Sequence, residues 1–352
     1  MYLLRARLSG VGPFDDVVVP LSDEEGQARL VTVVHGGGGV GKTTLLGSIA
    51  ATRPGHALPQ PPRARDSETV EDESPPFVVC DWLLGRDDPE RPHPLRVTGP
   101  NVRLDADVEL ETLRRREQAL FDRVAREGGF AFVAISSTRW FSRQPIGFSA
   151  PGRTIARYDV RSPAALDDAS RSDLARETKQ ALAYAAITAA LDTPRSGKNF
   201  ALLGEAMKTA VDELVGLAGY AYAGLDSSSF EPLFVDGAGR SGTFDALPTR
   251  ARHLVAFAAL SVRALWGAYP SRDPREMEGL VAIDEVDAHQ DPAVETRLVS
   301  ALKEALPNVQ WILTTTSPVV AGSCDTRDVL ALRRLPEQDR VELFLGSEAR
   351  VH

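Results

Sequence analysis

With 352 residues, 43% of them hydrophobic, the chain is long enough to bury a sizeable core in one large domain or two entwined ones. Its formal net charge of −9 argues against a protein coated in nucleic-acid-binding surface, although a local basic groove is compatible with that charge. No apolar run approaches the roughly 20 residues that span a bilayer, the N-terminus lacks the layout of a signal peptide, and two cysteines do not make a disulfide framework, so we expect a cytoplasmic protein without a membrane segment.

The first fifty residues predict strands that lead into a helix. Residues 2–9 suggest a first strand, and the turn residues Gly10–Phe14 separate it from a second strand that opens at Val17. Residues 30–34 (LVTVV) form a short apolar run that is typical of a buried strand. An Ala/Leu-rich helix is expected over residues 44–51.

The glycine-rich run between this strand and this helix is the sharpest motif of the chain. Residues 36–43 (GGGGVGKT) fill every fixed position of the phosphate-binding pattern G-x-x-x-x-G-K-[ST]. Backbone N–H groups and the N-terminus of the helix make such a loop an anion site. Lys42 is expected to reach the β- and γ-phosphates, and the Thr43 hydroxyl to bind Mg²⁺. A flexible glycine turn is the alternative, but a turn needs neither the lysine nor the threonine.

The predicted ATP-binding set covers the whole loop and the start of the helix. It consists of Gly36, Gly37, Gly38, Gly39, Val40, Gly41, Lys42, Thr43 and Thr44.

The next hundred residues predict a loop and an antiparallel subsheet. Residues 52–76 are rich in proline and in charged side chains, which indicates a long exposed loop. Strand-like runs follow at 77–84, 95–98 and 102–104, with turn residues between them. A charged amphipathic helix is expected at 107–126.

The rest of the chain predicts a helical insertion followed by a return to strands and helices. The pattern is helical throughout from about 165 to 224. Other elements are expected at 130–135 (strand), 200–217 and 253–266 (helices), 279–283 (strand), 292–306 (helix), and 310–314, 329–333 and 341–345 (strands). One sheet is therefore split in sequence, and its two halves flank the helical insertion.

An acid pair at the end of the strand 279–283 completes the predicted site. Nucleotide hydrolysis of this class needs a carboxylate for Mg²⁺ and a group that polarises the attacking water. Four apolar residues run directly into Asp284 and Glu285, and we assign Asp284 to the metal and Glu285 to the water. The alternative is a strand that ends in a solvated acidic turn. That alternative is less attractive in a chain that also carries a complete phosphate loop.

Four stretches, spread over nearly the whole chain, resemble one known family. A Gly-Pro-Phe turn precedes the phosphate loop, and residues 284–292 (DEVDAHQDP) resemble the family's D-E-P-E-x-H-L-H-P. Residues 311–318 (WILTTTSP) resemble its strand that ends in T-H-S-P. Residues 246–254 (ALPTRARHL) fall where the L-S-S/G-G-E/Q signature precedes a buried helix, a match of position only. The chain thus resembles the ABC-type ATPases of the SMC, RecF and OLD kind, also called AAA_21 or AAA_15 ATPases.

This resemblance implies an α/β fold: a P-loop NTPase of the ABC-ATPase type with an antiparallel β-subdomain and an inserted helical lobe. The implied division is 1–150 for the first half of the ATPase core, 151–250 for the helical lobe and the degenerate signature, and 251–352 for the second half of the core. It also implies two protomers that close head-to-tail on two ATP molecules, with Lys42 and Thr43 facing residues 248–252 of the partner.

Three residues depart from the family pattern, and we expect them to affect ATP turnover more than ATP binding. Pro248 stands at the usual serine position and Arg250 at the usual glycine position of the signature. Arg250, or else Arg252, is a candidate arginine finger in trans, and a surface or salt-bridge role is an equally weighted alternative. Thr316 replaces the switch histidine and has no titratable imidazole. We count Glu285, Lys42, Thr316 and Arg250 as catalytic candidates and expect slow or partner-dependent hydrolysis.

Several weaker candidates each have a structural alternative. Ser137 and Arg139 follow a strand and are candidates to sense the metal or the γ-phosphate, with a plain strand-end turn as the favoured alternative. The others are Phe14 (near adenine, or core), His289 (across the dimer interface), His35 (buried structure) and Arg114–Arg116 (a solvated helix face, or a phosphate contact).

The biological role is less determined by the sequence. The chain shows no sustained heptads of an SMC coiled coil, and because the sequence stops at His352 we expect no TOPRIM nuclease of the OLD kind after the ATPase. We expect a stand-alone ATPase that works with a separately encoded effector, such as a nuclease in DNA repair or phage defence. The alternatives are a nucleotide-gated scaffold with little hydrolysis and an ATPase that binds DNA directly.

Overall fold

The computed structural model describes most of the chain. The described residues are 1–52, 77–83, 95–98, 119–121, 123, 127–143, 145–146, 173–192, 199–335 and 340–349. The predicted loop beyond Thr52, the strand expected at 102–104, most of the helix expected at 107–126 and its arginines 114–116 lie outside them.

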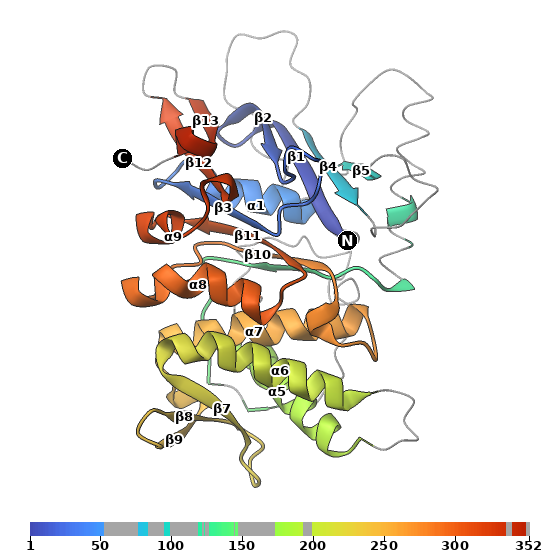
Figure 1. Cartoon of the computed structure of the whole chain (residues 1–352), viewed down its shortest axis with the longest axis vertical. Coiled ribbons are helices and arrows are strands. Elements are labelled where there is room, and N and C mark those ends of the chain that lie inside the picture. The colour runs from blue at the N-terminus through green and yellow to red at the C-terminus, as the bar shows by residue number, and fades with distance from the viewer. Residues whose placement is uncertain are drawn as a thin grey trace.

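A six-stranded sheet forms the centre of the molecule (Figure 1), in the order β13-β12-β3-β11-β10-β6. Its strands are β3 (Val31–Gly36), β6 (Phe132–Ile135), β10 (Gly279–Ile283), β11 (Val309–Thr315), β12 (Val329–Leu335) and β13 (Arg340–Leu345). Neighbouring strands are parallel except in the β12–β13 pair. Strands β10 and β11 are buried along their whole length, as expected of parallel strands covered on both faces. Early and late strands of the chain are interleaved in this sheet, because β3 lies between β12 and β11 and β6 lies beside β10.

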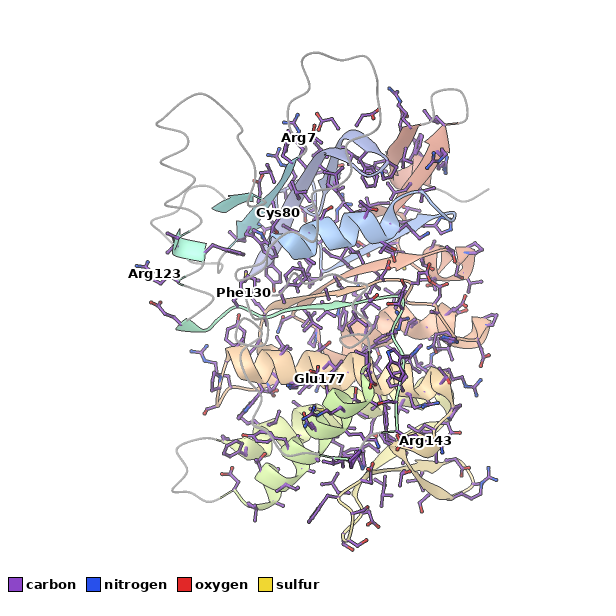
Figure 2. All side chains as sticks on the ribbon, turned by 180° about the vertical axis from the view of Figure 1, so that it is seen from behind. Arg7, Cys80, Arg123, Phe130, Arg143 and Glu177 are labelled. Atoms are coloured by element: carbon purple, nitrogen blue, oxygen red, sulfur yellow. The ribbon has the colours of Figure 1, made fainter. Side chains whose placement is uncertain are left out.

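An antiparallel sheet lies on one side of the central sheet, and helix α1 (Lys42–Ala51) runs between the two (Figure 1). It has the order β2-β1-β4-β5, with β1 (Tyr2–Val11), β2 (Phe14–Pro20), β4 (Phe77–Leu83) and β5 (Leu95–Thr98). The antiparallel pairing predicted between the runs at 77–84 and 95–98 is therefore confirmed, and β1 and β2 complete the sheet. Cys80 on β4 lies beside α1 (Figure 2), and burial raises the pKa of its thiol to about 12, so it is an inert core residue.

Helices cover the opposite face of the central sheet (Figure 1). Helices α7 (Thr249–Ala268) and α8 (Pro292–Ala305) lie next to the sheet, and α5 (Ala175–Ala190) and α6 (Phe200–Val215) pack on their far side. Helix α7 is buried on nearly all sides, as its uniformly apolar sequence predicts. It begins at Thr249, four positions before the predicted start at His253, so the arginines of the signature region lie in its first turns. Glu177 of α5 is labelled in Figure 2. Its carboxylate forms an ion pair with Arg263 of α7 at 3.5 Å.

A three-stranded antiparallel sheet follows α6, in a region where the sequence predicts helix up to residue 224. Its strands are β7 (Tyr220–Leu225), β8 (Pro232–Asp236) and β9 (Ser241–Thr243). The helical prediction is wrong here because α6 ends at Val215, and Gly219, with a φ of +82°, turns the chain into β7. Tyr222 and Phe234 then pack their rings 5.5 Å apart on the buried face of the sheet.

The remaining elements are short. They are the helix α9 (Pro318–Gly322) and the 3-10 helices η1 (Gly216–Ala218), η2 (Phe244–Ala246), η3 (Pro274–Glu276), η4 (Thr326–Asp328) and η5 (Gly346–Ala349). Within the described part of the chain, none of the helices combines the length and apolarity that a bilayer crossing requires.

Candidate functional site

The glycine loop joins β3 to α1 and is open on one side. Gly37, Gly38 and Gly39 are exposed, and a Cβ added at any of them would meet no atom within 4 Å. Gly39 and Gly41 have φ values of +74° and +92°, a region that side chains other than glycine disfavour. The open side therefore leaves room for a ligand to approach the backbone N–H groups of the loop.

The other side of the loop rests on the N-terminal turn. A Cβ at Gly41 would lie 2.5 Å from Pro13 Cγ and 2.8 Å from Phe14 Cζ, and one at Gly12 would lie 2.8 Å from Thr44 Cγ2. Phe14 is fully buried, so the structure gives it the core role that is the alternative to an adenine contact. The N-terminal turn therefore packs against the glycine loop on the side away from its open face.

Lys42 at the start of α1 is folded back over the loop. Its Nζ donates to the carbonyl oxygens of Gly36 at 2.9 Å and Gly37 at 2.8 Å, and the residue is only 6% exposed. Burial lowers the pKa of the ammonium, and the nearby carboxylates of Glu285, Asp284 and Asp287, in that order, oppose the shift. Among the described residues, the hydrogen-bond acceptors of this buried cation are neutral carbonyls, and such a cation is suited to an incoming anion.

Asp284 and Thr43 meet although they are far apart in the sequence. Thr43 Oγ1 donates to Asp284 Oδ2 at 2.7 Å, and Thr314 Oγ1 donates to Asp284 Oδ1 at 2.6 Å. Asp284 is 1% exposed. The parallel pairing of β10 with β11 and of β11 with β3 brings these strand ends to one edge of the sheet. The two residues that we assigned to Mg²⁺ are thus in direct contact.

Glu285 lies beside this pair in an unusual backbone conformation. Its φ is +47°, which is uncommon for a residue other than glycine and indicates local strain. Its N–H donates to Thr314 Oγ1 at 2.8 Å. Thr314 therefore holds both acids, the side chain of Asp284 and the main chain of Glu285.

Arg139 lies beneath the acid pair and not on the surface. Its guanidinium donates to the carbonyl oxygens of Asp284 at 2.6 Å, Glu285 at 2.7 Å and Ser136 at 3.0 Å. Burial lowers its pKa to about 10, against the opposing effect of the nearby acids, so it stays charged at neutral pH. A sensor of the metal or the γ-phosphate does not fit this position. Ser137 lies in the turn that follows β6, as the favoured alternative predicted.

The start of α7 and the segment after the acids pack against each other. Arg250 forms an ion pair with Asp291 of its own chain, and the Arg252 guanidinium lies 5.5 Å from the centre of the Phe141 ring. His253 is buried, and its Nδ1 lies 3.2 Å from the carbonyl oxygen of Ala288, which only accepts. The ion pair corresponds to the structural alternative for Arg250, while its role in a dimer stays a prediction.

Burial lowers the pKa of His253 to about 3, with the charge of Arg139 as the second cause, so its imidazole is neutral. His289 has a φ of +66°, and its ring centre lies 5.0 Å from that of His253.

Thr316 follows β11 and is exposed beside the phosphate-loop strand. Its neighbour Thr315 pairs with His35 in the sheet register, and the Thr315 hydroxyl donates to Asp287. His35 is half-buried; burial and then the charge of Lys42 lower its pKa, while a hydrogen bond with the Thr316 backbone opposes the shift. Thr316 therefore lies at the same sheet edge as Lys42 and the acid pair.

Three features of this site do not follow from the sequence analysis. They are Thr314, the bonds of Arg139 to backbone carbonyls, and Arg334, whose guanidinium donates to the Gly39 carbonyl oxygen at 3.2 Å. A threonine within the apolar run 309–315 is a usable signal for the first. The other two bonds go to main-chain atoms of distant residues and leave no pattern in the sequence.

The residues at the site fit a Mg²⁺–nucleotide and not a metal held by protein alone. Among the described residues, no group of three or more His, Cys, Asp or Glu side chains is placed to hold a metal. Mg²⁺ in nucleotide sites is typically held by one or two protein ligands together with phosphate oxygens and water. The contact of Thr43 with Asp284, next to open glycine N–H groups, matches that requirement.

Two solved structures share the fold over nearly the full length. The SMC head domain from Thermotoga maritima aligns with a TM-score of 0.51 and 16% identity, covering 98% of this chain and 99% of that one. An SMC head bound to the C-winged helix domain of ScpA aligns with a TM-score of 0.54 and 16% identity, covering 99% of each chain. The fold is therefore that of the SMC head, an ABC-type P-loop ATPase fold, and the predicted resemblance and fold class are confirmed.

Sequence relatives match over short segments, and no protein-family model matches the chain. The "Retron Ec83 probable ATPase" of Escherichia coli is 33% identical over 18% of this chain, and the "Retron Vc95 probable ATPase" of Vibrio cholerae is 32% identical over 23%. The "Septu protein PtuA" of Bacillus mycoides is 48% identical over 12%. These matches span 12%, 16% and 6% of the relatives' own lengths, respectively.

Proposed function

We propose that this chain is an ATP-binding and ATP-hydrolysing subunit that associates with a second copy when ATP is bound. One observation carries the proposal: Thr43 of the glycine loop and Asp284 after β10, both of residue types that hold Mg²⁺, are hydrogen-bonded at 2.7 Å across 241 residues of sequence. The names of the retron relatives, which include the word ATPase, support the same activity.

Each residue has a distinct role in this proposal. The N–H groups of residues 36–44 and the Lys42 ammonium bind the phosphates. Thr43 and Asp284 hold Mg²⁺, which when bound neutralises charge on the β- and γ-phosphates. Glu285 orients and deprotonates the attacking water, and Thr316 binds the γ-phosphate or that water through its hydroxyl.

The resemblance to SMC-type ATPases supports the proposed dimerisation. In the proposed closed state the first turn of α7, with Arg250, faces the nucleotide of the partner. ATP at that interface contacts both chains, so its binding free energy favours closure. The division at residues 150 and 250 into two core halves and an inserted lobe is part of the same proposal.

Replacing Arg250 by alanine tests its role across the interface. Arg250→Ala should lower turnover at least about tenfold with ATP affinity nearly unchanged, because an arginine finger stabilises charge that develops in the transition state. Asp291→Ala is the matched control, since it breaks the same ion pair but keeps the guanidinium. Equal rates in wild type and Arg250→Ala would remove the finger from the proposal.

The biological role that we favour is a defence ATPase that drives or gates a separately encoded effector. The similarity to retron and Septu proteins supports it. The acidic net charge of −9 mildly favours a protein partner over bare DNA. Co-purification of the chain with the product of a neighbouring reading frame, dependent on ATP, is the expected result. Salt-dependent binding of duplex DNA by the isolated dimer would favour a direct DNA-binding ATPase instead.

Hydrolysis is tested by comparing wild type with Glu285→Gln in a steady-state phosphate-release assay with Mg²⁺-ATP. The amide keeps the size of the side chain but does not accept the proton, so turnover should fall at least about 100-fold. ATP affinity, measured by calorimetry, should stay within about threefold, and the Glu285→Gln dimer should persist longer in size-exclusion chromatography. A wild type that is no faster than Glu285→Gln would leave a nucleotide-gated scaffold as the function.

A further inference from the structure

The turn that follows β10 is held in a conformation that the chain does not favour by itself. Glu285 and His289, only a few residues apart, both have positive φ values, +47° and +66°. Such strain persists only where the surroundings enforce it. What surrounds this turn therefore decides where the Glu285 carboxylate lies.

Strand β11 holds the amide side of the turn. Thr314 Oγ1 accepts from the Glu285 N–H at 2.8 Å, and the Val286 N–H donates to the Thr314 carbonyl at 2.9 Å. These bonds fix the N–H groups that follow Asp284. The carbonyl oxygens of Asp284 and Glu285 are held by a different residue.

Arg139 supplies that group from the loop after β6. One nitrogen of its guanidinium donates to the Asp284 carbonyl at 2.6 Å and the other to the Glu285 carbonyl at 2.7 Å, so the planar fork spans the two consecutive acids. The residue is only 4% exposed, and its guanidinium lies 5.1 Å from the centre of the Phe257 ring on α7. The fork is therefore fixed on one side by α7 and on the other by the acid turn.

The choice of partners sets Arg139 apart from an ordinary structural arginine. Buried arginines are usually paired with a carboxylate, because an uncompensated buried charge is costly. In the described part of the chain, Arg139 hydrogen-bonds only to backbone carbonyls, and its Nε has no partner. A buried charge with this geometry has a specific effect: it fixes the main chain that carries Asp284 and Glu285.

We infer that Arg139 is the positioning residue for Glu285: its guanidinium fork holds the left-handed turn that aims the Glu285 carboxylate at the attacking water. The inference rests on the proposed function for the identity of the reaction. Arg139 acts through the main chain and touches neither nucleotide nor metal. The side chains that bind phosphate and metal are positioned without Arg139. Lys42 is hydrogen-bonded to the glycine loop, and the Asp284 side chain is hydrogen-bonded to Thr43 and Thr314.

The test replaces the fork by a single ammonium in Arg139→Lys, which keeps the charge and loses the bidentate geometry. Steady-state turnover of Mg²⁺-ATP should fall at least about tenfold, while KM and the calorimetric ATP affinity stay within about threefold. Hydrogen exchange of the amides in residues 284–289 should become at least about tenfold faster. Arg263→Lys is the matched control, a buried arginine of α7 that pairs with Glu177, and it should leave both readouts unchanged.

Two outcomes overturn the inference. One is an Arg139→Lys protein with the turnover and exchange of wild type. The other is a parallel loss of affinity and turnover, or faster exchange in Arg263→Lys at the same amides, which would indicate general loosening. If Arg139→Lys does not fold, Phe257→Leu keeps the guanidinium but removes its aromatic support, and it should show the same pattern with a smaller change of about threefold.

This experiment separates the two proposals. If wild type binds ATP but does not hydrolyse it, the proposed enzyme activity fails while the exchange comparison still decides whether Arg139 holds the turn. If wild type hydrolyses ATP and Arg139→Lys does so equally well, only the positioning role fails.

Discussion

The glycine loop and the acid turn lie at the same edge of the central sheet but are built in opposite ways. The loop, residues 36–44, is determined locally: glycines supply its positive φ values, and its lysine bonds to carbonyls five and six residues away. The acid turn, residues 284–289, has positive φ at residues other than glycine and is held by side chains from the loop after β6, from α7 and from β11. The conformation of the loop is thus determined by neighbouring residues in the sequence, whereas that of the turn depends on contacts with residues distant in the sequence. Substitutions in the loop should therefore weaken ligand binding, whereas substitutions in the acid turn should lower stability and turnover.

The largest expected effect is on the loop itself. Lys42→Ala removes the ammonium and should weaken ATP binding at least about 100-fold, roughly 2.7 kcal/mol, with little change in the free energy of unfolding. Calorimetric titration with Mg²⁺-ATP measures the affinity. Lys208→Ala, which removes an exposed lysine paired with Asp212 on α6, is the control and should bind ATP like wild type. An affinity of Lys42→Ala within about threefold of wild type would contradict the assigned phosphate site.

The acid turn should instead respond in stability. Thr314→Val leaves the Asp284 carboxylate and the Glu285 N–H each short of a hydrogen bond in a buried site, and we expect a loss of about 2 kcal/mol in the free energy of unfolding. Thr32→Val is the matched control, because Thr32 is equally buried in the same sheet and its hydroxyl has no partner among the described residues. Urea unfolding of both variants should show the loss in the first only. A similar loss in Thr32→Val would assign the effect to β-strand packing.

A pH-dependent effect follows from the histidine that supports the turn. The pKa of His253 is about 3 in the folded chain and about 6.5 when unfolded, so between these values the unfolded state binds the extra proton. Stability should therefore fall as the pH drops below about 6.5, by about 1.4 kcal/mol at pH 5.5 from this group. Urea unfolding at pH 7.5 and pH 5.5 measures the difference. His253→Gln should reduce the pH dependence, and His289→Gln, which removes the neighbouring imidazole, should keep it.

The smallest expected effect concerns a long-range contact that the loop receives from β12. Arg334→Ala removes a guanidinium that donates to the Gly39 carbonyl, and we expect ATP affinity to fall about threefold, more at low salt than at high salt. Arg340→Ala, on the neighbouring strand and paired with Glu342, is the control for the loss of one charge. Equal affinities of the two variants at low salt would show that Arg334 has no specific role.

The same contrast explains what could be predicted from sequence. The loop, the acid pair and the buried strands around them are encoded by contiguous residue types, so the convergence of Lys42, Thr43 and Asp284 could be predicted from the sequence alone. The sheet β7–β9 was missed because strands of three to six residues between glycines carry little periodicity. The hydrogen bonds of the Arg139 guanidinium could not be predicted because they join a side chain to carbonyl oxygens about 145 residues away, and every residue type has a carbonyl.

The interleaving of the central sheet has a consequence for how the protein is made. Strand β3 ends at Gly36, yet its neighbours β11 and β12 begin only at Val309 and Val329 and therefore emerge from the ribosome much later. At about 5–20 residues per second, the apolar strand waits some tens of seconds for its partners. The nascent chain therefore carries a complete glycine loop before the acids that complete the site are made, and nucleotide can stabilise the protein only after β10 and β11 have been synthesised.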